Sequence, residues 1–402
     1  MEDKKKKAFQ LIILFGLVSL FGDIVYEGAR SVNGPYLNTL GANAAAVGLI
    51  AGLGEFVGYG IRLFSGYFAD RTRAYWAFTF IGYGLLISVP LMALTGIWQM
   101  AALFIVCERL GKAMRAPSKD TILSQAAKQV GTGWGFALNE AMDQIGAIAG
   151  PLLFVFLFAL TGTRQKTLVD YQHGYALLFI PFVLLMACVV VAFLRVPEPA
   201  ALEAPSGQKE PEHLSKLFWL YTAFSFITVI GFVSFVLMGY HFKAKGILTD
   251  AQIPLFYAIA MAVDGVAALI IGKLYDMLKE HKKKEEAGLL MLIFVPLLSA
   301  FIPVFAFAHS FGSVLVSVVL WGIVMGAHET VMKSAIADIT PIKKRGTGYG
   351  IFNAGYGVAM LIGGAAMGFL YDVSIPLMVL AASTIEFLAL PVFFLMKKEL
   401  KS

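Results

Sequence analysis

Long apolar segments recur along the whole chain, and short polar segments separate them. Hydrophobic residues make up 58% of the 402 positions. An apolar run of about 20 residues is long enough to cross the hydrocarbon core of a bilayer as a helix, and a helix satisfies its own backbone hydrogen bonds in lipid. The pattern predicts twelve membrane-spanning helices, near residues 9–37, 44–69, 75–95, 97–115, 132–160, 172–195, 216–241, 252–275, 287–307, 311–335, 346–371 and 375–396.

The charged residues lie mainly between these segments. They make up 14% of the chain, against about 25% in an average soluble domain. If the N-terminus is cytoplasmic, the loops on the opposite side hold only four basic residues: Arg164, Lys166, Lys243 and Lys245. The positive-inside rule then predicts that both termini are cytoplasmic, in a cell (inner or plasma) membrane. Membrane topology and contact with the lipid bilayer explain the basic clusters, so no nucleic-acid partner is expected.

A polar linker and two repeated motifs indicate that the chain has two related halves. The longest polar segment is residues 197–215, and residues 1–196 and 216–402 each contain six predicted spans. The motif GYFAD at 66–70 returns as GKLYD at 272–276, and GTGWG at 131–135 returns as GTGYG at 346–350. We therefore predict an all-α membrane protein with two pseudo-symmetric six-helix bundles, an architecture found in secondary transporters.

At these motifs the chain resembles the major facilitator superfamily, over essentially its whole length. The segment GYFADRTR at 66–73 is similar to that family's signature loop, with Gly66, Asp70 and Arg71 matching and Arg73 standing where the pattern has a second glycine. The resemblance implies two bundles around a central cavity that opens alternately to either side. It also implies that Gly66, Asp70, Arg71 and Asp276 govern this conformational exchange without touching substrate. Segments of the first and fourth helices are similar to bacterial drug- and nickel-resistance efflux permeases.

Ionisable residues inside membrane spans are costly and are therefore functional candidates. Asp23, Glu27 and Arg30 are spaced by four and three residues, which places them on one face of the first helix. We interpret them as a site that couples transport to a proton or cation, with Arg30 as the internal counter-charge. The alternative is a structural ion pair near the outer interface.

The second helix carries a similar stripe. Glu55, Tyr59 and Arg62 are again spaced by four and three residues. Glu55 is expected near the middle of the membrane, where it either binds a proton or pairs with a cation of a neighbouring helix such as Arg30.

The fifth helix holds a pair of carboxyl groups followed by a glycine motif. Glu140 and Asp143 share a face, and two adjacent carboxylates do not both ionise cheaply, so the pair is suited to exchanging a proton for a cation. Gly146, Gly150 and Pro151 resemble the antiporter motif of drug exporters, although leucines follow where that motif has glycines. The alternative for these glycines is close helix packing with a proline kink.

Further charged positions lie towards the predicted cytoplasmic ends of spans. Glu108 and Arg109 in the fourth helix, and His328 and Glu329 in the tenth, are candidates for ion pairs that form in one conformational state and break in another. Asp264 in the eighth helix is a candidate cavity residue. The sequence offers no role for Glu386, which lies in the last helix.

Signatures of enzymes are missing from the sequence. There is no phosphate-binding loop, no nucleophile elbow and no HExxH motif, and the histidines are scattered. We therefore expect a membrane transporter that is not an enzyme, with no cofactor and no resident metal, acting as a monomer.

Together these features predict a secondary active transporter that works by alternating access. The leading hypothesis is proton-coupled export (antiport) of a small cationic or amphiphilic compound. The alternative is an importer or facilitator of a small organic anion or metabolite, with Arg30 and Arg62 as binding residues. A receptor or lipid scramblase on the same scaffold is a third hypothesis.

Overall fold

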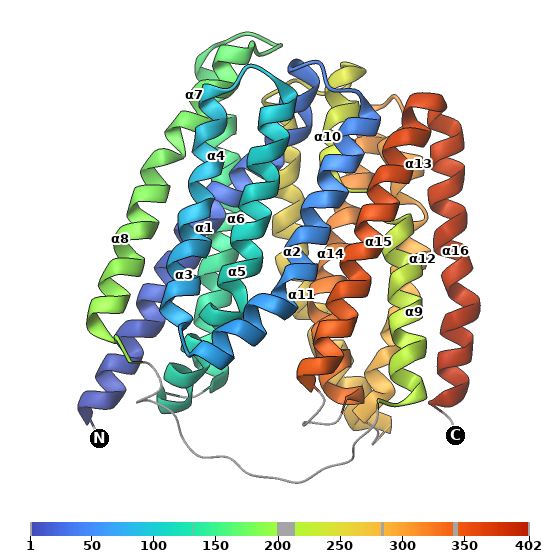
Figure 1. Cartoon of the computed structure of the whole chain (residues 1–402). Helices are drawn as coiled ribbons and strands as arrows, with labels where there is room; N and C mark the ends of the chain where they lie inside the picture. Colours follow the sequence, from blue (N-terminus) through green and yellow to red (C-terminus); the bar gives the residue numbers. More distant parts are fainter. Residues whose placement is uncertain (1, 131, 199–213, 283–284, 341–344, 401–402) are drawn as a thin grey trace. The chain divides into compact units, whose positions relative to one another are not determined.

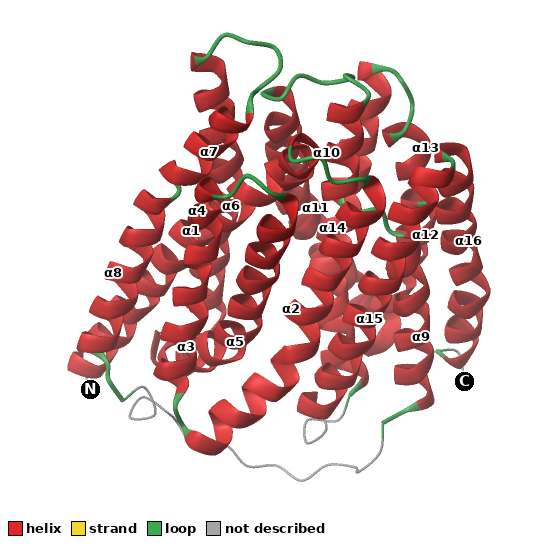
Figure 2. Ribbon diagram, turned by 45° about the horizontal axis from the view of Figure 1, so that its top comes forward, coloured by secondary structure: helices red, strands yellow, loops and turns green. Residues whose placement is uncertain are grey.

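A computed structural model describes residues 2–130, 132–198, 214–282, 285–340 and 345–400. The side chains of a few further residues lie outside the description: 2–4, 127–130, 132–137, 276, 282, 285–287, 332–334, 337 and 345–347. Most of the predicted linker, residues 199–213, also lies outside it. The described part of the chain is helical and contains no strand (Figures 1 and 2).

The helices follow the predicted apolar segments, several of them in two or more pieces. Up to residue 198 they are α1 (Glu2–Thr39), α2 (Ala44–Thr72), α3 (Tyr75–Gly84), η1 (Leu85–Ile87), α4 (Ser88–Leu91), η2 (Met92–Leu94), α5 (Trp98–Val130), α6 (Thr132–Leu160), α7 (Leu168–Leu177) and α8 (Phe179–Arg195). From residue 214 they are α9 (Lys216–Gly231), α10 (Phe235–Ala244), α11 (Gln252–Lys282), η4 (Glu285–Ile293), α12 (Phe294–Ser299), α13 (Ile302–Ala306), α14 (Phe311–Ile339), α15 (Arg345–Val373) and α16 (Ile375–Glu399).

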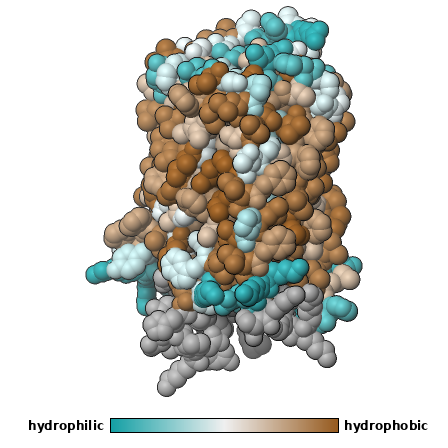
Figure 3. Space-filling view, turned by 90° about the vertical axis from the view of Figure 1, so that its right-hand side faces the viewer, coloured by the Kyte–Doolittle hydropathy of each residue, from teal (hydrophilic) through white to brown (hydrophobic). Residues whose placement is uncertain are grey.

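Eleven helical segments of the described residues are long and apolar enough to cross a membrane. The twelfth predicted span, 97–115, is the first part of α5, where Glu108, Arg109, Lys112 and Arg115 lower the mean hydropathy. The face shown in Figure 3 is hydrophobic over its middle and hydrophilic at its described ends, as expected for a surface that contacts lipid. Large apolar side chains such as Leu380 (64% exposed) and Leu388 (59% exposed) of α16 lie outward.

The chain divides into two compact units. The first consists of Met1–Gly41, Val57–Gly207 and Thr249–Ala258, and the second of Ala42–Phe56, Gln208–Leu248 and Ile259–Ser402. The division runs through two helices, because the beginning of α2 belongs to the second unit and the beginning of α11 belongs to the first. The two six-helix halves, 1–196 and 216–402, stay a prediction.

Glycines bring α1 and α6 together in the first unit. A Cβ atom added to Gly150 would lie 2.5 Å from the Ile24 carbonyl oxygen and 2.7 Å from the Gly28 backbone nitrogen. A Cβ added to Gly146 would lie 2.4 Å from the Leu20 carbonyl oxygen. Only glycine permits this approach, so the predicted close-packing role of the motif has a direct geometric basis.

A comparable glycine contact joins the beginning of α2 to α15 in the second unit. A Cβ added to Gly48 would lie 2.2 Å from the Gly364 carbonyl oxygen, and one added to Gly364 would lie 2.6 Å from the Gly48 carbonyl oxygen. At the end of this contact, the Asp372 carboxylate accepts hydrogen bonds from the backbone nitrogens of Ala44 (3.2 Å) and Ala45 (2.8 Å). Asp372 of α15 therefore caps the N-terminus of α2.

Two membrane spans of the second unit are interrupted. Residues 232–234 separate α9 from α10, and Ser234 begins α10 by accepting a hydrogen bond from the Leu237 backbone nitrogen. Residues 300 and 301 separate α12 from α13, where Pro303 stands in the first turn of α13. Each interruption leaves helix-end carbonyl groups inside the span.

Candidate functional site

Asp23 of α1 and Asp143 of α6 form a carboxyl pair inside the first unit. The two carboxyl groups lie close enough to repel one another when both are ionised, and both side chains are partly exposed. The pair depends on the glycine contact between α1 and α6, since a Cβ added to Gly146 would lie 3.0 Å from the Asp23 Cβ. Two neighbouring carboxyl groups do not both ionise cheaply, so this arrangement is suited to sharing one proton.

Polar residues of three helices surround the carboxyl pair. Lys119 of α5 interacts electrostatically with both Asp23 and Asp143. Its ammonium group donates a hydrogen bond to the Ser19 hydroxyl (2.8 Å), which donates in turn to the Asn139 side-chain oxygen (3.1 Å). A fixed cation therefore lies beside the two carboxyl groups.

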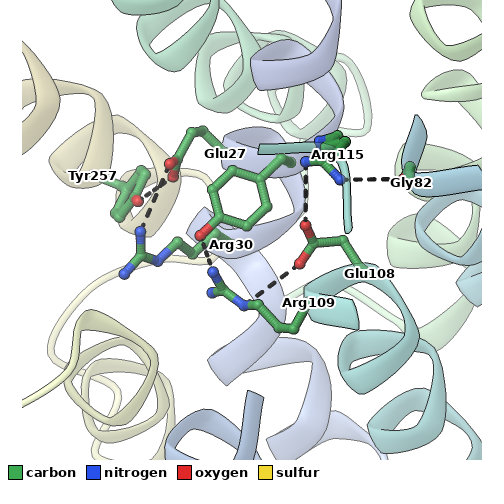
Figure 4. Close-up of polar contacts among 8 residues, drawn as sticks. Glu27, Arg30, Gly82, Glu108, Arg109, Arg115 and Tyr257 are labelled. Carbon is green, nitrogen blue, oxygen red and sulfur yellow. Dashed lines mark hydrogen bonds and ion pairs between the residues drawn. The ribbon is translucent and has the colours of Figure 1, made fainter. Parts of the chain in front are cut away.

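A second cluster surrounds the buried Tyr26 ring (Figure 4). The cationic groups of Arg30, Arg109 and Lys112 lie 5.8, 4.7 and 4.1 Å from the ring centroid. Arg109 also donates a hydrogen bond to the Tyr26 hydroxyl. The aromatic ring thus holds three cations in a region largely removed from water.

Two carboxylates neutralise part of this positive charge. Glu108 of α5 pairs with Arg109 (3.4 Å) and with Arg115 (3.7 Å), and Glu27 of α1 pairs with Arg30 (3.6 Å). Glu27 also accepts a hydrogen bond from the Tyr257 hydroxyl. The Tyr26 cluster thus brings four cations and two carboxylates together, and Lys112 also interacts electrostatically with the Asp23 carboxyl group.

The other predicted residues of the second and fifth spans take different positions. Arg62 stacks on Tyr59, with its guanidinium carbon 4.5 Å from the ring centroid. Glu55 is partly buried in the segment of α2 that belongs to the second unit. Glu140 is exposed, and the structure pairs Asp143 with Asp23 of another helix.

The predicted residues of the second unit do not form one cluster. Asp264 of α11 is buried, and its backbone carbonyl oxygen lies against Gly326. His328 of α14 is buried between the rings of Phe232 and Tyr356. Its neighbour Glu329 is exposed. In the described residues, no group of three or more His, Cys, Asp and Glu side chains is arranged to hold a metal ion.

The signature loop has local contacts at the end of α2. Tyr75 donates a hydrogen bond to Asp70 (3.1 Å), and Arg71 donates one to Tyr67 (2.9 Å). A Cβ added to Gly66 would lie 3.4 Å from the Pro117 side chain of α5.

The corresponding loop of the second half is described only in part. A Cβ added to Gly272 would lie 3.1 Å from the Thr330 side chain of α14. The side chain of Asp276 lies outside the described residues.

Arg73 has a left-handed backbone conformation, with φ of 55°. This is the position at which the family pattern has a second glycine. Glycine adopts this conformation without strain, whereas the Arg73 side chain makes it strained.

Sequence reasoning missed several residues of the two clusters. Ser19, Tyr26, Lys119, Asn139 and Tyr257 were not singled out, although all five lie within or beside predicted spans. Tyr26 and Lys119 carried a usable signal, because an aromatic residue between two acids and a lysine followed by an acid are both unusual in a span.

The fold and the buried polar clusters define a polytopic membrane protein of the transporter class. The family model of the Major Facilitator Superfamily matches residues 13–302 and 286–402, which is nearly the whole chain. The chain belongs to this superfamily. It is a membrane transporter for a small molecule, of the secondary type, and not an enzyme.

Relatives and solved structures agree with this assignment. A protein of Mycobacterium tuberculosis named as uncharacterised is 38% identical over 96% of this chain and 93% of its own length. An MFS-type transporter of Methanocaldococcus jannaschii is 24% identical over 90% of this chain and 89% of its own length. The crystal structure of a nucleoside transporter variant aligns with a TM-score of 0.71 and 16% identity, over 96% of this chain and 99% of that one, which shows the shared fold.

Proposed function

We propose that this transporter is coupled to protons and that the pair Asp23 and Asp143 carries the coupling proton. The observation that supports the proposal is the close approach of the two carboxyl groups across the glycine contact between α1 and α6. Loss of the shared proton leaves two adjacent negative charges, which repel one another and separate α1 from α6 at this level. Protonation therefore changes the packing of the two helices.

The substrate in this proposal is a small cationic or amphiphilic compound that leaves in exchange for protons. A cation that approaches the Asp23 and Asp143 carboxyl groups competes with the shared proton for the same negative charge. Binding of one displaces the other, which is the thermodynamic basis of antiport. We place both termini in the cytoplasm and the chain in the cell membrane as part of the same proposal.

The four cations of the Tyr26 cluster favour a second candidate, the uptake of a small organic anion. Arg30 and Lys112 are only partly buried, so an anionic group has access to two of the four cations. In this case the proton of the carboxyl pair and the anion move in the same direction.

Proteoliposomes that contain the full-length protein distinguish these functions. A pH gradient is imposed, and the uptake of labelled tetraphenylphosphonium (a lipophilic cation) and of benzoate (an organic anion) is measured. Export by antiport predicts accumulation of the cation on the more acidic side. The second candidate predicts accumulation of the anion on the more alkaline side. Both results are measured against protein-free liposomes, because benzoic acid and tetraphenylphosphonium also cross a bilayer unaided. Flux of either probe that does not depend on the pH gradient contradicts proton coupling.

A further inference from the structure

Glu386 of α16 is a buried carboxyl group that the proposed coupling mechanism does not use. It is 0% exposed and lies on the inner face of α16, between Ala382 and Ala389. The Ser299 hydroxyl donates a hydrogen bond to Oε1 (2.6 Å), and Oε2 has no hydrogen-bond partner among the described residues. No Lys, Arg or His side chain of the described residues pairs with it. A carboxyl group in such a place either carries a proton or pairs with a cation.

The carboxyl group lies beside the end of α9. A Cβ added to Gly231, the last residue of α9, would lie 3.0 Å from Oε1 and 3.1 Å from Cδ of Glu386. The last carbonyl groups of a helix have no partner within that helix, and they carry the negative end of the helix dipole. Gly231 therefore lets the carboxylate approach a group of backbone oxygens.

The same carboxyl group also lies beside the end of α12. Ser299, which donates to Oε1, is the last residue of α12. In a continuing helix, the Ser299 carbonyl oxygen would accept a hydrogen bond from the backbone nitrogen four residues later. That residue is Pro303, which has no N–H group. Two interrupted spans thus present their C-terminal ends to one buried carboxylate.

The polar side-chain groups at this place are oxygen atoms, the Glu386 carboxyl group and the Ser299 hydroxyl, and the C-terminal ends of α9 and α12 lie beside them. Hard cations bind to such sets, and interrupted membrane helices use their C-terminal ends to coordinate Na⁺. We propose that Glu386, Ser299 and the C-terminal end of α9 form a binding site for a sodium ion in the second unit. This site is separate from the Asp23 and Asp143 pair, and it would give the transporter a second ion whose gradient biases its conformations.

Thermal unfolding of the purified full-length protein tests this proposal. Melting temperatures are measured in NaCl, KCl and choline chloride at equal ionic strength. We expect NaCl alone to raise the melting temperature, by about 2–4 °C near ten times the dissociation constant. Glu386→Gln should abolish the Na⁺ effect, and Ser299→Ala should weaken the apparent Na⁺ affinity by about tenfold or more.

Ser383→Ala is the matched control. Ser383 lies almost one turn before Glu386 on α16 and donates its hydrogen bond to the Ala300 carbonyl oxygen (2.7 Å), so this variant loses a nearby hydrogen bond but keeps the proposed site. It should retain the full Na⁺ effect. Binding of ²²Na⁺ to each variant provides a readout that does not depend on the stability of the variant.

Three results would overturn the proposal. The first is an equal effect of KCl and NaCl, which is a general salt effect. The second is a Na⁺ effect or ²²Na⁺ binding that survives in Glu386→Gln. The third is a wild-type protein whose stability responds to pH through Glu386 but not to Na⁺, because the carboxyl group is then a proton site.

Discussion

The glycine contact between α1 and α6 allows a quantitative prediction for Gly150→Ala. The added Cβ would lie 2.5 Å from the Ile24 carbonyl oxygen, 2.7 Å from the Gly28 nitrogen and 3.0 Å from the Gly28 Cα. All three are backbone atoms, so no flexible side chain can move aside. The helices must separate by about 1 Å, and overpacking of this kind costs about 1–3 kcal/mol.

Part of that cost is offset, because alanine is a better helix former than glycine by up to about 1 kcal/mol. The expected net loss in the free energy of unfolding is about 1–2 kcal/mol, which corresponds to a fall in melting temperature of about 2–8 °C. Thermal denaturation of the purified protein in detergent, followed by tryptophan fluorescence, measures this fall.

Gly84→Ala is the control for this experiment. Gly84 is also helical, and a Cβ added to it meets nothing within 4 Å. This variant should keep or slightly raise the melting temperature. If Gly150→Ala and Gly84→Ala melt at the same temperature, the contact between α1 and α6 is not as close as described, and the argument for the carboxyl pair loses its support.

Three further substitutions test separate parts of the structure. Arg73→Gly removes the strain of the left-handed conformation at φ of 55°. It should stabilise the protein by up to about 1 kcal/mol in a thermal melt, and a lower melting temperature would disprove the strain. Asp372→Ala leaves the backbone nitrogens of Ala44 and Ala45 at the start of α2 uncapped and should lower the free energy of unfolding by about 1–2 kcal/mol. Asp372→Asn should recover part of that loss. Equal stability of the wild type and both variants would refute the capping role. Glu108→Gln leaves Arg109 and Arg115 buried without the Glu108 carboxylate and should lower the free energy of unfolding by about 3 kcal/mol or more. Its control, Glu140→Gln on the exposed side of α6, should change stability by less than about 0.5 kcal/mol. Similar melting temperatures for these two variants would contradict the buried ion pairs.

The helices could be predicted from the sequence because the bilayer requires long apolar segments, and these segments are visible without any tertiary information. The interruptions of spans are harder to predict. Residues 232–234 contain no proline, and only Gly231 before them and the capping residue Ser234 indicate a break. The division of α2 and α11 between the two units depends on packing between distant segments, which no local pattern records.

The candidate site was predicted in its residue types but not in its partnerships. The spacing of Glu140 and Asp143 predicted a pair on one helix, because sequence spacing reports only the neighbours along that helix. The structure instead pairs Asp143 with Asp23 across the glycine contact and leaves Glu140 exposed. Arg30 pairs with Glu27 one turn away, and its pairing with Glu55 stays a prediction. Glu386 had no interpretation until its two helix-end neighbours were known.

The central claim is that the carboxyl pair of Asp23 and Asp143 couples transport to protons, and Asp143→Asn in proteoliposomes tests it most directly. The amide keeps the size of the side chain but does not exchange a proton. The variant should still exchange labelled for unlabelled substrate across the membrane, with a rate that no longer depends on pH. It should fail to accumulate substrate when a pH gradient is imposed, whereas Glu140→Gln should accumulate it like the wild type. Accumulation by Asp143→Asn at the wild-type level, with the wild-type dependence on pH, would contradict the account.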